Sequence, residues 1–322
     1  MRNLSLAVLL LPILASAEPP AVTRFEANPI VRPEMLPGRD GQNINGPSLI
    51  RVPDFVVNPL GKYYLYFAHH NGQSIRLAYA DDLRGPWKVH APGTLHLEDV
   101  PACQGHIASP DVHVDTARKQ IRMYFHGPSR KARGQKSFVA TSADGISFKP
   151  SDEVLGLFYF RVVEYGGAWY AMAKGGMLYR SADGLTKFEP AGRSPLKNPE
   201  NAGADFNAAG SVRHVALQLT GNRLRVYYTR IGDAPERIVR AAIDLKGDWK
   251  EWMAGPDEEV LKPEAEYEGA KLPVVASKAG AVHGAENALR DPAIFSEGGK
   301  TYLIYSVAGE RGLAMAEVVE KE

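Results

Sequence analysis

Two short stretches of the chain bring acidic, basic and imidazole side chains close enough for proton-transfer chemistry. The first runs from Glu286 to Pro292 and reads Glu-Asn-Ala-Leu-Arg-Asp-Pro, so an acid, an amide, a guanidinium and a carboxylate fall within six positions. A guanidinium lowers the pKa of a neighbouring carboxyl group, whereas a drier surrounding raises it. We therefore expect Asp291 to act as a base and Glu286 as a proton donor. The alternative is structural, with Asp291 capping a turn and pairing with Arg290.

The second stretch opens with the polar segment His106-Ile-Ala-Ser-Pro-Asp-Val-His. Imidazole and carboxylate groups are frequent proton carriers near neutral pH, so Asp111 and His106 are further candidates for catalysis. The histidines show no close spacing typical of a zinc site, and no run of oxygen ligands has calcium-loop spacing. The sequence therefore predicts no metal ligands. The single cysteine, Cys103, is interpreted as an incidental loop thiol.

Five units, spaced roughly 40–75 residues apart, repeat one pattern along the chain. Each begins with a short strand that carries polar residues and continues, after a turn, into a strand rich in Tyr and Phe. The second and third units also share a Ser-Ala-Asp-Gly segment, which ordinary turn chemistry explains without a functional role. The five units begin near Asn45, His106, Tyr159, Val212 and Arg290.

Helical periodicity is scarce, and short alternating runs are separated by Gly, Pro, Asn and Asp. These features predict an all-β chain folded as a five-bladed β-propeller. We expect a single domain over residues 18–322. The segment Arg24–Ile30 is expected to complete the last blade and so remove exposed sheet edges.

Three strand openings resemble those of a known enzyme group. They are Asn45-Gly-Pro-Ser-Leu-Ile-Arg, Ala108-Ser-Pro-Asp-Val and Arg290-Asp-Pro-Ala-Ile-Phe. These segments are similar to the blade starts of five-bladed propeller glycosidases. The group contains the arabinanases and xylosidases of glycoside hydrolase family 43 and, more distantly, the levansucrases and invertases. The resemblance implies three acids in a central funnel, contributed by the first, second and third blades.

Only the second of these acids has a clear counterpart in this chain. Ser109-Pro-Asp-Val is similar to the motif of the family's helper Asp, so the resemblance gives Asp111 the role of an orienting carboxylate. In the first blade, Gly46 stands where the family has its base or nucleophile Asp. In the third, Phe158–Tyr159 lies near the place of the general-acid Glu. The missing groups must therefore come from Asp291, Glu286 or a histidine.

Side chains at the blade starts would point into the funnel and contact a substrate. Planar aromatic rings suit sugar rings, and guanidinium groups suit sugar carboxylates or sulfates. Several arginines at one funnel therefore indicate an anionic glycan, unless they serve to tie adjacent blades together. The expected substrate-binding residues are Asn45, Tyr159, Arg161, Arg213, His214 and Arg290.

The composition is that of a soluble globular protein. The chain has 322 residues and a formal charge of +1, with its basic residues scattered, which argues against nucleic acid or an anionic membrane as partner. Arg2, the apolar run Leu4–Leu14 and Ala15-Ser-Ala are typical of a signal peptide over residues 1–17. That run is too short to insert across a membrane. We expect a secreted or periplasmic protein.

These observations predict a secreted glycoside hydrolase that acts on a poly- or oligosaccharide by carboxylate acid–base catalysis in the central funnel. One alternative is a non-hydrolytic carbohydrate-binding propeller, and another is a structural or protein-binding propeller. Two carboxyl groups about 5–10 Å apart at one funnel end would favour the hydrolase. The resemblance also implies that a calcium ion can occupy the central channel.

Overall fold

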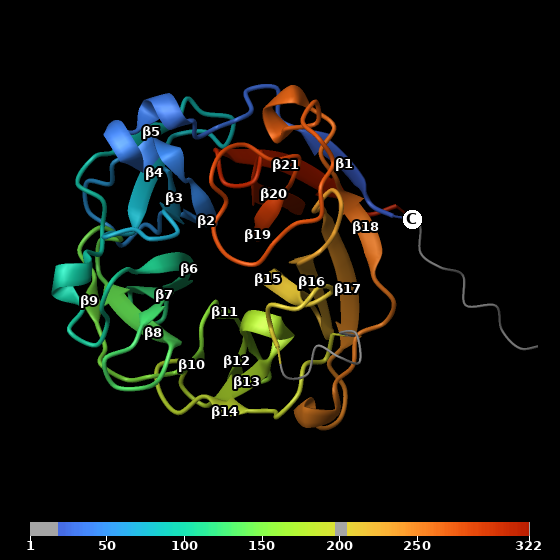
Figure 1. The fold of residues 1–322 in the computed structure, drawn as a ribbon. Coiled ribbons are helices and arrows are strands. Elements are labelled where there is room, and N and C mark those ends of the chain that lie inside the picture. The colour runs from blue at the N-terminus through green and yellow to red at the C-terminus, as the bar shows by residue number, and fades with distance from the viewer. Residues whose placement is uncertain (1–18, 197–204, 322) are drawn as a thin grey trace, which may run out of the picture.

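The computed structural model describes residues 19–196 and 205–321. Within these residues, five antiparallel sheets stand around a common axis (Figure 1). The chain completes one sheet before it begins the next, and the first strand of each sheet lies closest to the axis. The fold is therefore the expected all-β, five-bladed propeller.

Each blade is a meander of short strands. Blade I consists of β2 (Asn45–Arg51), β3 (Tyr63–Ala68), β4 (Arg76–Ala80) and β5 (Lys88–His90). Blade II consists of β6 (Ala108–Asp115), β7 (Gln120–Pro128) and β8 (Gln135–Ser142), with β9 (Lys149–Pro150) and β10 (Gly156–Leu157) both paired to β8. Blade III consists of β11 (Arg161–Tyr165), β12 (Ala168–Met172), β13 (Leu178–Ser181) and β14 (Glu189–Pro190).

The longest inner strand belongs to blade IV and has 9 residues. Blade IV consists of β15 (Val212–Thr220), β16 (Arg223–Arg230), β17 (Ile238–Asp244) and β18 (Glu258–Leu261). Blade V consists of β19 (Arg290–Glu297), β20 (Lys300–Ser306), β21 (Leu313–Val319) and β1 (Ala21–Arg24). The described helices are short 3-10 turns, namely η1 (Pro33–Met35), η2 (Gly38–Gln42), η3 (Leu97–Asp99), η4 (Lys174–Gly176), η6 (Trp249–Glu251) and η7 (Glu266–Glu268).

The N-terminal strand closes the ring. β1 pairs antiparallel with β21, from Ala21 opposite Val319 to Arg24 opposite Ala316. The closing strand therefore ends at Arg24, where the sequence places the start of such a segment. The regular ladder ends there because the chain turns after Arg24. The expected segment still contacts β21, since Asn28 exchanges hydrogen bonds with the Met315 backbone and the Ile30 N–H donates to the Leu313 carbonyl at 2.8 Å. Pairing at this position covers the edge of β21, as expected.

The second strand of a blade is buried on both faces because it lies between two neighbouring blades. In β3, Tyr64 and Tyr66 pack into a cluster shared with blade II, whereas Tyr63, Leu65 and Phe67 pack into a cluster shared with blade V. Alternate residues of one strand therefore serve two cores. This arrangement explains why the aromatic runs of the sequence lack a polar face.

The Ser-Ala-Asp-Gly turns join adjacent blades as well as adjacent strands. The Tyr66 hydroxyl of blade I donates to the Gly145 carbonyl of blade II at 2.7 Å. The Tyr124 hydroxyl of blade II donates to the Gly184 carbonyl of blade III, also at 2.7 Å. Gly145 has φ +75°, and a Cβ atom there would meet the Tyr66 hydroxyl at 2.8 Å. The turn glycine thus makes room for the contact between blades.

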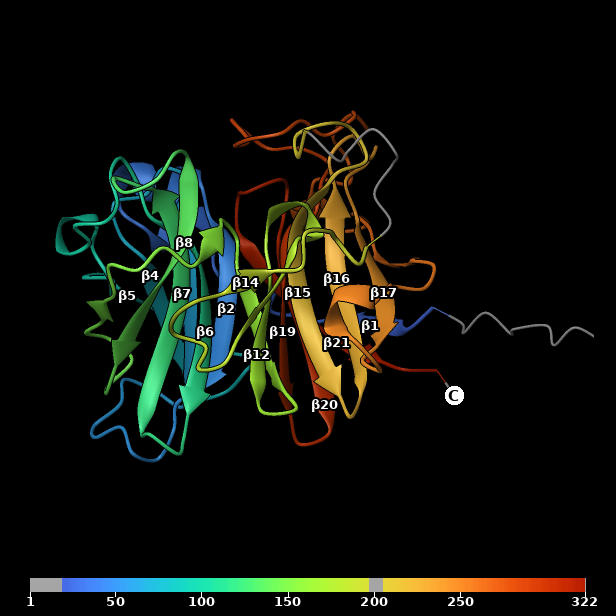
Figure 2. The same ribbon diagram turned by 90° about the horizontal axis from the view of Figure 1, so that it is seen from below.

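Long loops extend from one end of the propeller. The segments that precede β15 and β19 project beyond the sheets at that end (Figure 2). Viewed along the axis, the segment before β19 curves over the middle of the ring (Figure 1). None of the helices in the described ranges is long and apolar enough to cross a membrane. The signal peptide expected over residues 1–17 lies outside the described residues.

Arg122 is a fully buried cation that ties blade II to blade III. Its guanidinium contacts the Asp115 carboxylate at 2.7 Å, donates to the Asp183 carbonyl at 2.8 Å and lies over the Trp169 ring. Arg118 pairs with the same carboxylate at 2.9 Å, but its side chain is 63% exposed. Asp115 therefore pairs with one buried and one exposed arginine, so the contributions of the two ion pairs to stability can be compared directly.

We expect Arg122→Met to lower the free energy of unfolding by about 3 kcal/mol, because it leaves Asp115 without its buried partner. Arg118→Met should cost less than about 1 kcal/mol, since exposed pairs are screened by solvent. Urea denaturation followed by circular dichroism measures both. Equal losses in the two variants would contradict this account of the blade contact.

Candidate functional site

The first residues of the inner strands meet at one end of the central channel, which we term the start end. Each blade repeats the same meander, so these strands run in one direction around the axis. Four of them begin with a register shift, and the shifts lie between Asn45 and Ser48, Ala108 and Asp111, Val212 and Val215, and Arg290 and Ala293. Such bulges re-aim side chains. Gly46, Ser109 and Asp291 occupy matching positions with φ of +58°, 50° and 48°.

Asp291 and His214 form a buried acid–imidazole pair at the start end. The His214 Nδ1 atom contacts the Asp291 Oδ1 atom, and the Ser306 hydroxyl donates to Asp291 Oδ2 at 3.2 Å. Their exposed fractions are 1% for Asp291 and 7% for His214. Among the described residues, the buried His214 Nε2 atom has no hydrogen-bond partner. One imidazole nitrogen thus contacts a carboxylate, while the other is buried without a partner.

The electrostatic surroundings favour an ionised carboxylate at Asp291 and a neutral imidazole at His214. Burial, the largest influence, opposes the charged form of Asp291, but the charges of His214 and Arg290 outweigh it and hold the pKa of Asp291 below its usual value. Burial lowers the pKa of His214 despite the opposing charge of Asp291. An uncharged imidazole fixed by a carboxylate can accept a proton at its free nitrogen.

An aromatic group covers the pair. The Tyr159 ring lies 4.0 Å from the His214 ring and 4.5 Å from the His126 ring, measured between centroids. Burial, together with the charge of Asp291, raises the pKa of Tyr159. His106 lies one layer further out, with its ring 6.2 Å from His126 and its Nε2 atom 3.2 Å from the Gln135 side-chain oxygen. The structure therefore brings Tyr159 to His214, and connects His106 to them only through His126.

A buried network of arginine and glutamate holds the same end together. Glu236 is fully buried and contacts Arg213 Nε at 2.7 Å and Arg290 Nε at 2.8 Å. Arg290 also contacts Glu310 at 3.5 Å and Glu286 at 3.2 Å. Both arginines are thus neutralised by carboxylates. This geometry favours the alternative of arginines that tie blades together over arginines that bind an anionic glycan.

Glu310 supplies a carboxylate beside blade I, where the sequence lacks one. Its Oε2 atom accepts from the Asn43 side chain and, at 3.2 Å, from the Asn45 side chain, and it lies 3.7 Å from His70 Nδ1. Gly46 has no room for an acid, because a Cβ atom there would lie 3.0 Å from the Ser109 Cα atom. Asn45 therefore binds an acid that blade V contributes.

Sequence reasoning missed Glu236, Glu310 and Lys174, three buried charged residues of the start end. The sequence offered one feature that could have drawn attention to Glu310. This residue lies in the Gly-rich turn Gly309-Glu-Arg-Gly, between two segments with a clear strand pattern. A charged residue inside such a turn is ordinarily solvated, so the pattern could not show that Glu310 turns inward.

Asp111 faces a different cavity. Its Oδ2 atom lies 2.7 Å from His113 Nε2 and accepts from the Val162 N–H at 2.8 Å. Burial opposes ionisation, but the charges of His113 and Arg161 keep the pKa of Asp111 below its usual value. The surrounding cavity, of about 370 Å³, is lined by later residues of the inner strands, including Arg51 and Phe295. We term this opening the far end of the channel.

Arg161 lies in the channel itself. Its guanidinium donates to the carbonyl oxygens of Pro110, Val215 at 3.3 Å and Pro47 at 3.5 Å, which belong to three other inner strands. It therefore cross-links four blades at the axis. The sequence predicted this arginine as a sugar ligand, and the structure occupies its guanidinium with backbone oxygens instead.

The channel does not fit the calcium ion that the resemblance implies. The carbonyl oxygens of Pro47, Pro110 and Val215, which could coordinate such an ion, already accept from Arg161, and a guanidinium repels a second cation. Within residues 19–196 and 205–321, no group of three or more His, Cys, Asp and Glu side chains could hold a metal.

Comparison with known proteins gives one relative in sequence and many in fold. No family model matches the chain. The chain is 40% identical over 324 residues to "Uncharacterized protein R118" of Acanthamoeba polyphaga mimivirus, which covers 92% of this chain and 90% of the relative.

Solved structures share the fold at low identity. The GH43_1 enzyme from Xanthomonas citri in complex with xylose aligns with a TM-score of 0.57 at 14% identity, over 87% of this chain and 88% of that chain. An exo-1,5-alpha-L-arabinanase from a bovine ruminal metagenomic library aligns with a TM-score of 0.52, at 14% identity over 86% and 92%. A structure of the GH130 family of mannoside phosphorylases and hydrolases reaches 0.64, at 14% identity over 96% and 95%. The expected resemblance to family 43 propellers is confirmed as a likeness of fold.

We expect Asp291→Asn to lower the free energy of unfolding at pH 7 by about 3 kcal/mol, because it removes the charged partner of a buried imidazole. The pKa of Asp291 lies below its unfolded value of 3.8, so the carboxylate stabilises the fold above that pH and this contribution fades as pH falls below it. Urea denaturation at pH 7 and pH 3 should show a smaller difference at pH 3.

The matched control is Asp244→Asn, because Asp244 pairs with Lys246 on the surface and its side chain is 56% exposed. It should change the unfolding free energy little at either pH. A loss in Asp291→Asn that does not depend on pH would show that packing, and not charge, accounts for the effect.

Proposed function

The chain belongs to the same family as the mimivirus protein R118, and we propose that it is a secreted or periplasmic glycoside hydrolase acting on a poly- or oligosaccharide. The observation that carries the proposal is the convergence of ionisable groups at the start end of the channel. The Asp291–His214 pair lies there beside Glu286 and Glu310, which both contact Arg290. A lectin-like site would need aromatic rings and amides, but not several carboxylates around one guanidinium.

The fold supports this proposal by analogy. The GH43_1 enzyme was solved with xylose bound, and a second neighbour is an exo-arabinanase. A third neighbour comes from the GH130 family of mannoside phosphorylases, which contains hydrolases that target beta-1,2 mannosidic linkages in Candida mannan. Propellers of this shape thus carry glycoside chemistry in several proteins, although a shared fold does not transfer a substrate.

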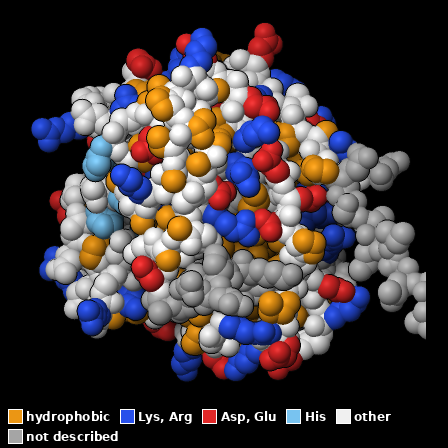
Figure 3. Space-filling view, turned by 45° about the vertical axis from the view of Figure 1, so that its right-hand side comes forward, with side chains coloured by type: hydrophobic (Ala, Val, Ile, Leu, Met, Phe, Trp, Pro, Cys, Tyr) orange, Lys and Arg blue, Asp and Glu red, His pale blue; other side chains and the backbone are white. Residues whose placement is uncertain are grey.

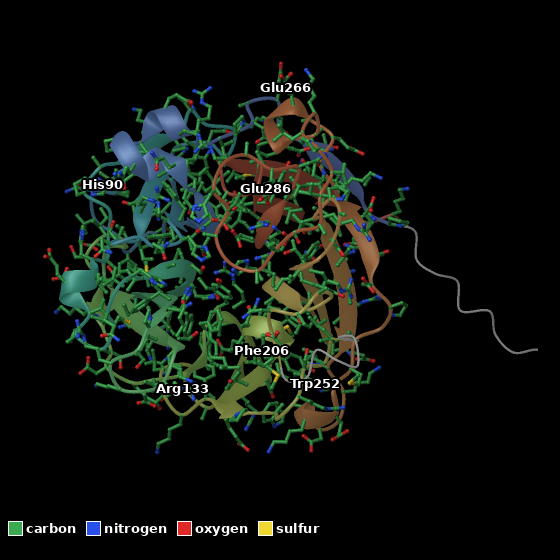
Figure 4. All side chains as sticks on the ribbon, viewed as in Figure 1. His90, Arg133, Phe206, Trp252, Glu266 and Glu286 are labelled. Carbon is green, nitrogen blue, oxygen red and sulfur yellow. The ribbon has the colours of Figure 1, made fainter. Side chains whose placement is uncertain are left out.

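A cavity adjoins the start end on the side of Asn43 and His70, which contact Glu310. It has a volume of about 560 Å³, opens between blades I and V and is also lined by the segment 281–284. This volume is typical of a small-molecule site. Glu286 is the most accessible acid of the group, with 35% of its side chain exposed, and it lies over blade V (Figure 4).

In the proposed reaction His214 takes a proton from the attacking water. Asp291 holds the imidazole in position and stabilises the cation that forms, so it acts through His214 because it is itself buried. Glu286 contributes a carboxylate at the mouth of the site, where positive charge develops on the sugar ring. Of the four predicted catalytic residues, Asp291 and Glu286 thus keep a part in the proposed reaction, with the base role moved from Asp291 to His214, whereas Asp111 and His106 have none.

The substrate that fits best is a neutral glycan. Arg213 and Arg290 lie at the start end, but Glu236 contacts both guanidinium groups, so neither is free to select a sugar acid. On the face shown in Figure 3, acidic and basic side chains are interspersed and form no large patch of one sign. A site with internally paired charges gains little from an anionic substrate.

The test is hydrolysis of plant, fungal and bacterial polysaccharides, together with nitrophenyl xylosides, arabinofuranosides and mannosides. We expect the wild type to release reducing ends or nitrophenol from at least one of them. His214→Ala, Asp291→Asn and Glu286→Gln should each lower kcat/KM by roughly 100-fold or more, as expected for loss of a proton-transfer group or its partner. The surface variant Asp244→Asn serves as the control.

Two outcomes would change the assignment. Loss of activity in Asp111→Asn with the start-end variants unaffected would move the reaction to the far end, as the family motif implies. Saturable binding of a glycan without turnover would favour the carbohydrate-binding alternative, which the missing blade I carboxylate at Gly46 also supports.

A further inference from the structure

The proposed hydrolysis still needs a group that protonates the leaving oxygen. The carboxylates of the start end are poorly suited to this task. Asp291 contacts His214, Glu310 accepts from two asparagine side chains, and Glu236 holds two arginines. Glu286 is engaged by the Arg290 guanidinium at 3.2 Å.

Lys174 lies beside the position where the resemblance implies a general acid. That position is the start of the inner strand of blade III, where the chain has Phe158 and Tyr159. The Lys174 N–H donates to the Phe158 carbonyl at 2.9 Å, so the 3-10 turn η4 is held against this strand start. η4 also packs on β15, the strand that carries His214.

The Lys174 side chain is enclosed, with an exposed fraction of 3%. Phe206 lies over the turn, since a Cβ atom on Gly175 would meet its ring at 2.3 Å, and Figure 4 shows Phe206 across the ring from Glu286. Within the described ranges, the Lys174 ammonium forms no ion pair with a carboxylate. Burying an ammonium without a paired acid is costly, so such a group loses its proton more easily than an exposed lysine.

The charged groups around Lys174 come from every element packed against it. They are Arg213 and His214 on β15, Asp205 before β15, Glu236 before β17 and Asp291 on β19. Burial is the largest influence and, together with the charge of Arg213, lowers the pKa of Lys174 to about 7, against the opposing charges of the three acids. An ammonium of this kind can release its proton near neutral pH, which an ordinary lysine cannot.

We propose that Lys174 is the general acid of this site and donates its proton to the glycosidic oxygen as the bond to the sugar carbon breaks. The inference rests on the proposed function. The electron pair of the broken bond stays on the leaving oxygen, which takes the proton from Lys174. The water oxygen forms the new bond to the sugar carbon, and its proton passes to His214 Nε2. Return of one proton from His214 to the Lys174 amine, through solvent, restores the site.

The proposal predicts which substrates depend on Lys174. Leaving groups that are stable as anions, such as 2,4-dinitrophenolate, need no proton, whereas a sugar alkoxide does. Lys174→Met should therefore slow hydrolysis of the natural glycan by roughly 100- to 10,000-fold. The same variant should slow the 2,4-dinitrophenyl glycoside of the released sugar by less than about tenfold.

The pH profile gives a second readout. In the wild type, kcat/KM for the glycan should rise as His214 loses its proton, at a pKa below 6.5, and fall as Lys174 loses its proton near pH 7. In Lys174→Arg the falling limb near pH 7 should disappear. That variant should remain slow on the glycan, since a guanidinium keeps its charge but does not release a proton in this range.

Lys246→Met is the matched control, because the Lys246 side chain is 74% exposed and pairs with Asp244 far from the channel. It should leave both substrates and the pH profile unchanged. Thermal unfolding of each variant shows whether a loss reflects folding, and Lys174→Arg, which keeps the buried charge, covers the case in which Lys174→Met does not fold.

The outcomes separate the two proposals. Equal losses on the glycan and on the dinitrophenyl glycoside would overturn the role of Lys174 while leaving the hydrolase intact. Selective loss on the glycan in Glu286→Gln would transfer the role to Glu286. Lysine side-chain NMR, assigned with Lys174→Arg, tests the same residue without substrate, and a Lys174 ammonium that stays protonated through pH 9 would overturn the inference. A wild type that cleaves nothing in the panel would overturn both proposals.

Discussion

One buried carboxylate organises the start end of the channel. Glu236 accepts a hydrogen bond from Arg213 of blade IV and forms an ion pair with Arg290 of blade V, so it joins the first residues of two inner strands. Taking three charges out of water is expensive, and the arrangement is favourable only because each cation has its anion within contact. The residues next to these arginines are His214 and Asp291, so the same ion pairs that close the gap between blades also fix the acid–imidazole pair.

Arg161, a third arginine, separates the start end of the channel from the far end. Arg161 donates to carbonyl oxygens of three neighbouring inner strands and sits where an ion could otherwise have bridged the blades. The start end beyond it carries Asp291, His214 and Glu310, and the far end carries Asp111 and His113. Acids that look like members of one catalytic set in the sequence therefore belong to two separate sites.

The comparison with glycosidase propellers shows how a site can be rebuilt on an unchanged scaffold. Gly46 stands where the resemblance implies an acid of the first blade, and its positive φ and the nearby Ser109 disfavour a side chain there. A carboxylate is supplied to the same place by Glu310 of blade V, held by Asn43 and Asn45. In the third blade, an aromatic strand start is accompanied by Lys174 from the neighbouring turn. In this chain, loops and turns thus supply charged groups at positions where the resemblance implies acids on the inner strands.

The sequence by itself determined the scaffold, because the alternation of short aromatic strands and turn residues is a local property that the propeller repeats five times. It also placed Asp291, His214, Arg290 and Tyr159 at the funnel, since each lies at or within two residues of the start of an inner strand. It placed the closing strand at Arg24–Ile30, although β1 ends at Arg24, because pairing with β21 depends on a partner almost 300 residues away. Only the tertiary structure decided which charges meet. Glu236, Glu310 and Lys174 lie in turns that look solvated, and their burial follows from the packing of other blades around them. The geometry of the ring determines which charged residues of different blades contact each other, and no local sequence pattern predicts those contacts.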